Sequence, residues 1–369
     1  MKIVVTGSRG FIGINLCVFL REQQHHVLEI HRETEQKDML SYLSQADFVF
    51  HLAGTNRPKN PAEFQSGNVD LTRYIVGSLL GSNSGIPIVL ASSTQAEDDN
   101  EYGASKWAAE KIVESYSDAT GAASYIYRLP NVFGKWCKPD YNSFVATFCN
   151  NIANGLDILV HDPKAPVRLA YIDDVCGAFL QLLEGKGSSG FHKLPVEYNT
   201  TVGEVANIIS SFKSSRTTLI TERVGAALTR ALYSTYLSYI PPDKFNYTIP
   251  SYADERGVFC EMLKTKDSGQ FSFFTAHPGI TRGGHYHHTK NEKFLVIKGE
   301  AVFKFENIST GKRHELMVRG SHSEIVETVP GWTHNITNIG DEDLIVMLWA
   351  NEIFDRQRPD TITRELFKD

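Results

Sequence analysis

The chain has 369 residues, of which 22% are charged and 41% hydrophobic, and its net charge is −6. These values are ordinary for a globular protein of two or three domains, and they exclude disorder, a collagen-like chain and a coiled coil. No apolar run reaches the roughly 18 residues that span a membrane, and no block of lysine and arginine is present. We therefore expect neither a membrane nor a nucleic acid as a partner.

The N-terminus and the cysteines favour a cytoplasmic protein. The first residues, MKIVVTGSRG, reach a glycine at position 7, which is atypical of a signal peptide. The 5 cysteines have no CxxC spacing, which is typical of reduced thiols and leaves no cysteine-based zinc site. Histidine is less evenly spread, since 7 of 13 fall between His277 and His334, where even spreading predicts about two.

Residues 1–240 alternate short apolar strands with amphipathic helices. Strands are expected at KIVVTG, VLEIH, DFVFHLAG and IPIVLASS, and helices at FIGINLCVFLREQQ, VDLTRYIVGSLLGS and ASKWAAEKIVESYSDATG. This alternation predicts an α/β fold with a doubly wound parallel sheet and helices on both faces. Residues 241–253 carry three prolines and no helical period, which predicts a linker.

From about residue 254 the pattern changes to short strands separated by turns. Strands are expected at GQFSFFTAH, KFLVIKGEAVFKFENI, KRHELMVRG, SEIVETV and DLIVMLWAN, with turn residues in STGK and NIGDED. This pattern is typical of an all-β sandwich or barrel. We therefore expect two domains, residues 1–243 and residues 244–369.

Three glycines, Gly7, Gly10 and Gly13, stand between the first expected strand and the first expected helix. Glycine permits a tight turn and a close approach to a pyrophosphate, whose charge would face the N–H groups of the helix N-terminus. The spacing GxxGxxG departs from GxGxxG. Its position at a strand-to-helix turn nevertheless favours a dinucleotide-binding loop over a turn without a ligand.

The residues after the second expected strand bear on the choice of cofactor. An acid at this point binds the ribose 2′-hydroxyl of NAD, whereas here VLEIH ends in His31 and Arg32 follows. Arg32 is a cation suited to a 2′-phosphate, so we expect NADP(H). The alternative is that Glu29 is the ribose acid and that Arg32 is only a solvated surface charge.

Tyr102 and Lys106 stand four residues apart at the start of an expected helix, so they share one helix face. A tyrosine transfers protons near pH 7 only if its phenolate is stabilised, which a lysine ammonium would do. Ser92, Ser93 and Thr94 end the preceding strand, where open α/β sheets bind ligands, and a hydroxyl there would bind a carbonyl oxygen. The alternative for these hydroxyls is a helix cap or a loop contact.

These segments resemble an extended short-chain dehydrogenase/reductase that acts on nucleotide sugars. The matching segments, in family order, are TGSRGFIG, HLAG, NVDLT, SST, YGASK, RLPNVFG and RLAYIDDV. The resemblance implies that Tyr102 is the acid/base, that Lys106 lowers its pKa, and that Thr94 rather than Ser93 binds the carbonyl. The segment QAEDDNE between Thr94 and Tyr102 is atypical of the family.

The same resemblance implies a set of binding residues. Cofactor contacts would come from Gly7, Arg9, Gly10, Phe11, Ile12, Gly13, His31, Arg32, Leu52, Ala53, Gly54 and Lys106. Substrate contacts would come from Asn131 and Arg168, with Arg168 near the nucleotide diphosphate.

A second constellation lies in the all-β half, where residues 279–299 fit the pattern G-x5-H-x-H-x4-E-x6-G. Residues i and i+2 of a strand point to one side, so His285 and His287 would face one cavity. Glu292 would return on the next strand, and His334 would supply a third imidazole. Three imidazoles and a carboxylate suit Zn, Fe, Mn or Ni, with a coordination position open to solvent.

This half resembles a metal-binding cupin, which implies a jelly roll with one divalent metal, zinc being the first choice, on His285, His287, Glu292 and His334. The segment that leads to His334 corresponds to the second cupin motif and departs slightly from the family, since Pro330-Gly331 replaces P-x-G. The alternatives are a cupin that kept its histidines without a metal and a purely structural metal.

The pairing of the two modules resembles the bifunctional enzymes of capsular polysaccharide synthesis. It implies that the cupin epimerises C3 of a UDP-2-acetamido-2,6-dideoxy-4-keto-L-hexose. The reductase would then reduce the C4 ketone with NADPH to UDP-N-acetyl-6-deoxy-L-talosamine, en route to UDP-N-acetyl-L-fucosamine. A homodimer is expected by analogy.

Two other functions stay open. One is a keto-sugar reductase whose cupin serves only structure or dimerisation, and the other is a non-catalytic NADP-sensing protein. For the epimerase, the hypothesis places the acid/base groups among Tyr286, His288 and Lys290, although strand alternation turns Tyr286 and His288 away from the histidine face.

Overall fold

The computed structural model describes residues 1–81, 85–249, 252–254, 257–259, 263–265, 269–352 and 357–366. The chain divides into two compact units. Unit 1 comprises Met1–Ser143 and Val167–Asn199, and unit 2 comprises Phe144–Pro166 and Thr200–Asp369. The division of the sequence into domains of residues 1–243 and 244–369 stays a prediction.

Unit 1 is built on a six-stranded sheet whose paired strands all run parallel. In spatial order the strands are β2 (His26–Ile30), β1 (Lys2–Thr6), β3 (Phe48–His51), β4 (Ile88–Ser93), β5 (Ser124–Leu129) and β8 (Gly190–His192). The order reverses between β1 and β3, and ligands of open α/β sheets bind at such a reversal, beyond the carboxyl ends of the strands. A smaller sheet joins β6 (Asn131–Phe133), β7 (Pro166–Tyr171) and β9 (Tyr198–Thr201).

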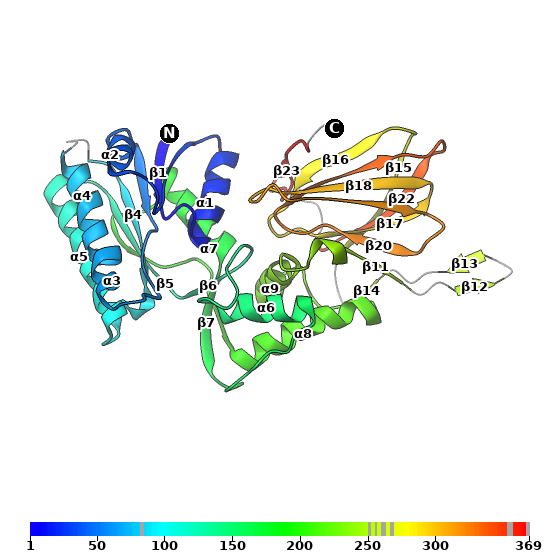
Figure 1. The fold of residues 1–369 in the computed structure, drawn as a ribbon, viewed down its shortest axis with the longest axis horizontal. Coiled ribbons are helices and arrows are strands. Elements are labelled where there is room, and N and C mark those ends of the chain that lie inside the picture. Colours follow the sequence, from blue (N-terminus) through cyan, green and yellow to red (C-terminus); the bar gives the residue numbers. More distant parts are fainter. Residues whose placement is uncertain are drawn as a thin grey trace. The chain divides into compact units, whose positions relative to one another are not determined.

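Helices cover both faces of this sheet (Figure 1). On one face lie α2 (Gln36–Ser44), α4 (Leu71–Gly81) and α5 (Glu101–Thr120), and on the other lie α1 (Phe11–Glu22) and α7 (Ile172–Leu183). The chain also forms short helical segments at α3 (Ala62–Phe64), η1 (Gln65–Asp70) and η2 (Thr94–Glu97). The predicted parallel sheet with helices on both faces is confirmed.

Buried aliphatic side chains of neighbouring strands form the core under α4 and α5. Val4, Val49, Leu90 and Ile126 come from four adjacent strands and are at most 1% exposed. Full burial of such a side chain contributes about 1.5–3 kcal/mol, so the continuous apolar strands of the sequence hold the sheet between its helices.

Unit 2 contains three helices and the β-rich part of the chain. The helices are α6 (Phe144–Asn154), α8 (Val202–Thr218) and α9 (Ala227–Leu237), which pack against one another, and a 3-10 turn η3 (Pro242–Lys244) follows. Among the described residues, no helix of either unit has the length and apolar character of a membrane span.

The β-rich part forms two five-stranded antiparallel sheets. The first sheet has, in order, β11 (Asn246–Thr248), β20 (Glu324–Glu327), β17 (Glu292–Lys298), β22 (Leu344–Ala350) and β15 (Gln270–Ala276). The second has β19 (Arg313–Arg319), β18 (Glu300–Asn307), β21 (Trp332–Asn338), β16 (Thr281–Tyr286) and β23 (Ile362–Thr363). Two short pairings join β10 (Ile220–Thr221) to β14 (Lys264–Thr265) and β12 (Tyr252–Asp254) to β13 (Gly257–Phe259).

The two five-stranded sheets share a core. The ring centroids of Phe294 on β17 and Phe303 on β18 lie 5.5 Å apart, so side chains of the two sheets meet. Along β18 buried and half-buried residues alternate strictly, as expected for a strand with one face toward a core. The C-terminal part consists mostly of strands, as predicted, whereas a jelly-roll cupin barrel stays a prediction.

The prediction of a linker at residues 241–253 is wrong for its middle part. Residues 246–248 form β11, which pairs with β20, and residues 250–251 lie outside the described residues. The preceding Phe245 is fully buried, with its ring 5.5 Å from Phe305 and 5.1 Å from Trp332. The sequence did not reveal this strand for two reasons. A three-residue edge strand is too short to show a period, and the neighbouring prolines are typical of a linker.

A buried ionic cluster joins α8 to the first β-sheet of unit 2. Glu327 forms ion pairs with Lys293 and, at 2.8 Å, with Arg216 of α8. Lys293 Nζ also donates to the Tyr247 hydroxyl at 2.8 Å. The side chains of Lys293 and Glu327 are 2% and 3% exposed. Because buried charges need partners, this cluster makes the packing of α8 depend on one carboxylate.

Replacing Glu327 by glutamine should therefore destabilise unit 2. The buried Lys293 and the half-buried Arg216 would lose their counter-charge, and breaking a buried pair costs about 3–5 kcal/mol of unfolding free energy. Urea denaturation would measure this loss. As a control, Glu300→Gln removes a surface pair with Arg319 and should change stability by less than about 0.5 kcal/mol. Equal effects of the two substitutions would contradict the assigned role of Glu327.

Candidate functional site

The glycine loop lies where the strand order of unit 1 reverses. Gly7 has a φ of +68°, and a Cβ placed on it would lie 2.8 Å from the backbone nitrogen of Ala53, just after β3. A Cβ on Gly13 would lie 2.1 Å from the carbonyl oxygen of Gly7. Gly10 donates its N–H to the same oxygen at 2.8 Å. The structure thus brings the glycines and the HLAG segment together, with the N-terminus of α1 facing the reversal point.

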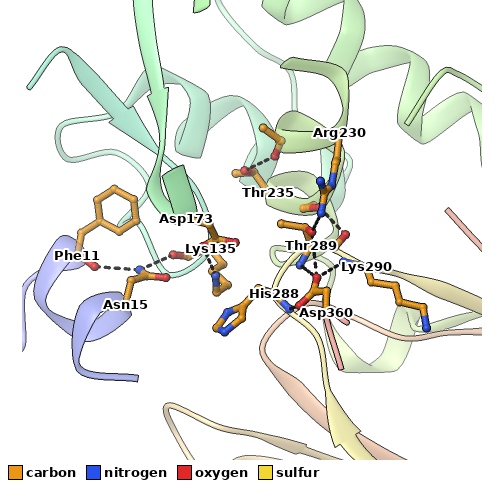
Figure 2. Close-up of polar contacts among 12 residues, drawn as sticks. Phe11, Asn15, Lys135, Asp173, Arg230, Thr235, His288, Thr289, Lys290 and Asp360 are labelled. Atoms are coloured by element: carbon orange, nitrogen blue, oxygen red, sulfur yellow. Dashed lines mark hydrogen bonds and ion pairs between the residues drawn. The ribbon is translucent and has the colours of Figure 1, made fainter. Parts of the chain in front are cut away.

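Phe11 and Ile12 form the first turn of α1 and are half-buried. The Phe11 carbonyl accepts a bond from Asn15 Nδ2 at 2.9 Å, and Asn15 Nδ2 also donates to the Lys135 carbonyl at 3.2 Å (Figure 2). Lys135 Nζ in turn pairs with Asp173 at 2.5 Å. These bonds fix the start of α1 against α7 within unit 1.

The tip of β2 lies beside the glycine loop, because Ser8 donates its N–H to the Ile30 carbonyl at 3.2 Å. Arg9 of the loop pairs with Glu33, so one cation of the loop reaches the segment after β2. His31 accepts the Glu33 N–H through Nδ1 at 3.3 Å.

Arg32 and Glu29, the two candidates for binding the cofactor ribose or its phosphate, lie in different surroundings. Arg32 is exposed. Glu29 forms an ion pair with Arg21 of α1. This pairing occupies the Glu29 carboxylate, whereas the Arg32 side chain is exposed two residues beyond the end of β2.

Tyr102 and Lys106 lie in the first two turns of α5, which begins after Asn100. The Asn100 side chain accepts the Gly103 N–H at 2.8 Å and caps the helix. Ser93, the last residue of β4, lies within reach of the Tyr102 hydroxyl. Thr94 begins η2 and is half-buried. Of the two predicted hydroxyls, that of Ser93 acts on the pKa of Tyr102, and its oxygen accepts the Gln95 N–H at 3.2 Å.

Lys106 is buried with its ammonium directed toward the end of β4. Its Nζ donates to the Ala91 carbonyl at 2.6 Å, and a Cβ on Gly54 would lie 3.6 Å from it. Burial lowers the pKa of Lys106 to about 8, against the opposing charge of Glu110. Burial raises the pKa of Tyr102, and the Ser93 hydrogen bond opposes this rise.

Asn68 belongs to this site, and the sequence analysis gave it no role. Its Oδ1 accepts the Thr55 N–H at 2.7 Å, and its Nδ2 donates to Ser105 Oγ at 2.8 Å, between Tyr102 and Lys106. Asn68 lies in the π-helical turn η1, a rare geometry that often marks functional sites. The signal was present in the NVDLT segment, but the π-turn that aims the side chain has no sequence signature.

Asn131 and Arg168 come together on paired strands, because Asn131 on β6 is in register with Leu169 on β7, the neighbour of Arg168. Both side chains are exposed. Arg168 forms an ion pair with Glu197 at 3.4 Å.

In unit 2 the four predicted ligands converge. His285 on β16 is in register with His334 on the neighbouring strand β21. Glu292 begins β17 of the facing sheet, and His287 lies just beyond the end of β16. The possible ligand atoms of all four lie within 4.8 Å of one another.

The chemistry of this His/Glu cluster fits a metal. His287 Nε2 and His334 Nε2 lie 3.3 Å and 3.5 Å from the same Glu292 oxygen. Burial and the neighbouring imidazoles lower the pKa of His285 to about 3, and burial lowers that of His334, so both rings are neutral at pH 7. The neighbouring histidines keep the pKa of Glu292 well below its usual value despite its burial. Neutral imidazoles and an ionised carboxylate are the forms that bind divalent metals.

Of the three predicted acid/base residues, Lys290 is the one that reaches the cluster. Its Nζ lies 2.9 Å from Glu292 Oε1. Tyr286 and His288 contact each other instead, with ring centroids 5.6 Å apart.

Both parts of the chain match known protein families. Residues 3–192 match the NAD dependent epimerase/dehydratase family, and residues 252–362 match the polysaccharide biosynthesis C-terminal domain. The chain belongs to the NAD dependent epimerase/dehydratase family.

Two relatives match the chain over nearly its whole length. UDP-2-acetamido-2,6-beta-L-arabino-hexul-4-ose reductase of Pseudomonas aeruginosa (strain PA103) is 53% identical, and the match covers 98% of each chain. The crystal structure of the capsular polysaccharide assembling protein CapF from Staphylococcus aureus is 41% identical, with a TM-score of 0.68, over 99% of this chain and 100% of that one. The resemblance to the enzymes of capsular polysaccharide synthesis is therefore confirmed.

A divalent metal should bind the His/Glu cluster with one equivalent per chain. His334→Ala removes a ligand atom, so it should weaken zinc binding by more than about 100-fold, beyond the cost typical of outer-shell changes. Competition with a chromogenic chelator would measure the affinity. His322→Ala removes an exposed imidazole and should leave it unchanged. Unchanged zinc affinity in His334→Ala would contradict the assignment.

Proposed function

We propose that this chain is a bifunctional UDP-sugar enzyme of capsular polysaccharide synthesis, with a C3 epimerase in its β-rich part and an NADPH-dependent C4 reductase in unit 1. Its substrate is a UDP-2-acetamido-2,6-dideoxy-4-keto-L-hexose, and its product is UDP-N-acetyl-6-deoxy-L-talosamine, en route to UDP-N-acetyl-L-fucosamine. The observation that carries the proposal is the presence, in one chain, of the Tyr102–Ser93–Lys106 arrangement and the His/Glu cluster.

In the reduction, NADPH supplies a hydride to C4 of the sugar. Tyr102 donates the proton that the ketone oxygen requires, and the Ser93 or Thr94 hydroxyl orients that oxygen. The buried Lys106 ammonium stabilises the phenolate that remains. Asn131 and Arg168 bind the nucleotide end of the substrate.

The preference for NADPH rests on the cations beside the glycine loop. Arg32, which is exposed and lies two residues beyond β2, is the cation expected at the 2′-phosphate of a bound dinucleotide, whereas Arg9 is paired with Glu33. Glu29 is paired with Arg21 and is therefore a poor ribose acceptor.

For the epimerase, the β-rich part is a cupin, and His285, His287, Glu292 and His334 hold one divalent metal, zinc being the first choice. The metal would stabilise negative charge on the C4 oxygen when C3 loses its proton. Lys290 is the first candidate for moving that proton, since its Nζ lies at the cluster. Removing the C3 proton and returning one to the opposite face inverts the carbon without any change in oxidation state. By analogy with related enzymes, the chain forms a homodimer.

The reduction should lose rate as the pH rises through the pKa of Lys106. This pKa is lowered from 10.5 to about 8, so the ammonium is charged at pH 7 and neutral well above pH 8. If only the charged form supports the phenolate, kcat falls about tenfold between pH 7 and pH 9. Steady-state kinetics with NADPH would record the profile.

Lys106→Arg provides the control for this pH dependence. The guanidinium stays charged over this range, so the variant should be slower but flat between pH 7 and pH 9. A flat profile in the unmodified protein would overturn the assigned role of Lys106.

A single reaction in D2O tests the two activities together. The protein, NADPH and the UDP-4-keto sugar are mixed, and the product is analysed by NMR. Deuterium at C3 together with NADPH consumption is the expected result, because the C3 proton is replaced from solvent before the ketone is reduced.

The other outcomes each remove one part of the proposal. NADPH consumption with hydrogen retained at C3 removes the epimerase and leaves the cupin a structural role. Deuterium at C3 without NADPH consumption removes the reductase. His334→Ala serves as the matched variant, since it should lose C3 exchange and keep reduction of a pre-epimerised substrate.

A further inference from the structure

The segment between the cluster residues His287 and Glu292 needs support from outside itself. Residues 288–291 belong to no helix or strand, so secondary structure does not satisfy their backbone N–H groups. Buried backbone N–H groups require partners. Those partners determine where the two flanking cluster residues lie.

Asp360 supplies most of these partners with one carboxylate (Figure 2). Its Oδ1 accepts the His288 N–H at 2.8 Å, and its Oδ2 accepts those of Thr289 and Lys290 at 2.6 Å and 2.7 Å. The Thr289 hydroxyl donates to Oδ2 at 2.9 Å. Three consecutive N–H groups that converge on one anion form a backbone nest.

The backbone of Asp360 acts on a cluster residue directly. Its carbonyl oxygen lies 2.5 Å from His287 Nδ1 and only accepts hydrogen bonds, so Nδ1 carries the proton. With the proton on Nδ1, Nε2 of the same ring, 3.3 Å from Glu292, is the nitrogen left to bind a divalent metal at the cluster. A bond of this kind sets the tautomer and orientation of a metal-binding histidine.

The Asp360 segment is itself anchored. Ile362 and Thr363 form β23, in register with Tyr286 and His285 of β16. Arg364 donates its N–H to the Gly284 carbonyl at 2.9 Å. The segment therefore runs beside the strand that carries His285.

Helix α9 holds the opposite side of residues 288–291. Ser234 Oγ donates to the Thr289 carbonyl at 2.9 Å, and Arg230 bonds the Thr289 hydroxyl. Arg230 also pairs with Glu352 at 3.2 Å. Thr289 is thus fixed between Asp360 and α9, which leaves these residues little freedom to move.

We infer that Asp360 is a positioning residue of the metal centre, fixing the His287 ring and the backbone between His287 and Glu292. This inference rests on the metal site of the proposed function. Asp360 is not one of the four cluster residues and acts through His287 and Lys290.

Zinc affinity of the full chain provides the test, measured by competition with a chromogenic chelator. Asp360→Ala removes all four side-chain bonds and should weaken zinc binding 10- to 100-fold, the range typical of outer-shell partners of metal ligands. Asp360→Asn keeps one acceptor oxygen, so it should fall between Asp360→Ala and the unmodified protein. It also serves if Asp360→Ala does not fold.

Asn307→Ala is the matched control. Asn307 is also buried in unit 2, and its Oδ1 accepts two consecutive backbone N–H groups, those of Ser309 and Thr310, at 3.0 Å and 2.9 Å. This variant should lose thermal stability and keep its zinc affinity. C3 exchange should show a lower kcat in the Asp360 variants, with reduction of a pre-epimerised substrate unchanged.

The possible results lead to different conclusions about Asp360 and about the metal site. Zinc affinity within about threefold of the unmodified protein in both Asp360 variants, or an equal loss in Asn307→Ala, overturns the role of Asp360. Absence of zinc binding by the unmodified protein overturns the metal site of the proposed function, which is a different result. A loss confined to the Asp360 variants supports the inference.

Discussion

The burial of ionisable side chains is the constraint on which both candidate sites depend, because a buried charge is stable only where partners face it. In unit 1 the ammonium of Lys106 is buried against the Ala91 carbonyl. In unit 2 the carboxylate of Glu292 is buried among imidazoles and the Lys290 ammonium. In both places burial costs free energy and also prepares side chains for chemistry. It lowers the pKa of Lys106 in unit 1, and it keeps the rings of His285 and His334 neutral in unit 2.

Strand ends deliver the reactive groups in both units, by different geometries. In the parallel sheet, the carboxyl ends of neighbouring strands meet at one edge, so Gly7 after β1 and Ala53 after β3 come into contact there. In the antiparallel sheets, the register between neighbouring strands brings the side chains together. His285 and His334 are cross-strand partners, and Glu292 faces them from the other sheet. The residues that position the His/Glu cluster of unit 2 are therefore spread more widely along the chain.

Much of the fold was predictable because its signals are local. Alternating apolar strands, the glycine turn and the helix that opens near Tyr102 each depend on a few consecutive residues. The close approach of His285, His287 and Glu292 was also predicted, since strand periodicity and a short turn fix their relative positions. His334 was expected from its motif and the resemblance to metal-binding cupins. Asn68 was missed because a π-turn aims it. Strand β11 was missed because its three residues show no period, and its stability comes from pairing with β20 and from the burial of Phe245.

By itself, the sequence determined the two classes of architecture, the glycine loop, the Tyr102–Lys106 pair and the spacing of the histidines. These features follow from periodicity and from the conformational limits of single residues. Only the tertiary structure decided that Ser93 comes within reach of Tyr102, that the pKa of Lys106 falls to about 8, and that Asp360 holds the backbone beside His287. The reason is physical: burial and long-range hydrogen bonds arise from residues far apart in the chain, and no local pattern records which of them will meet.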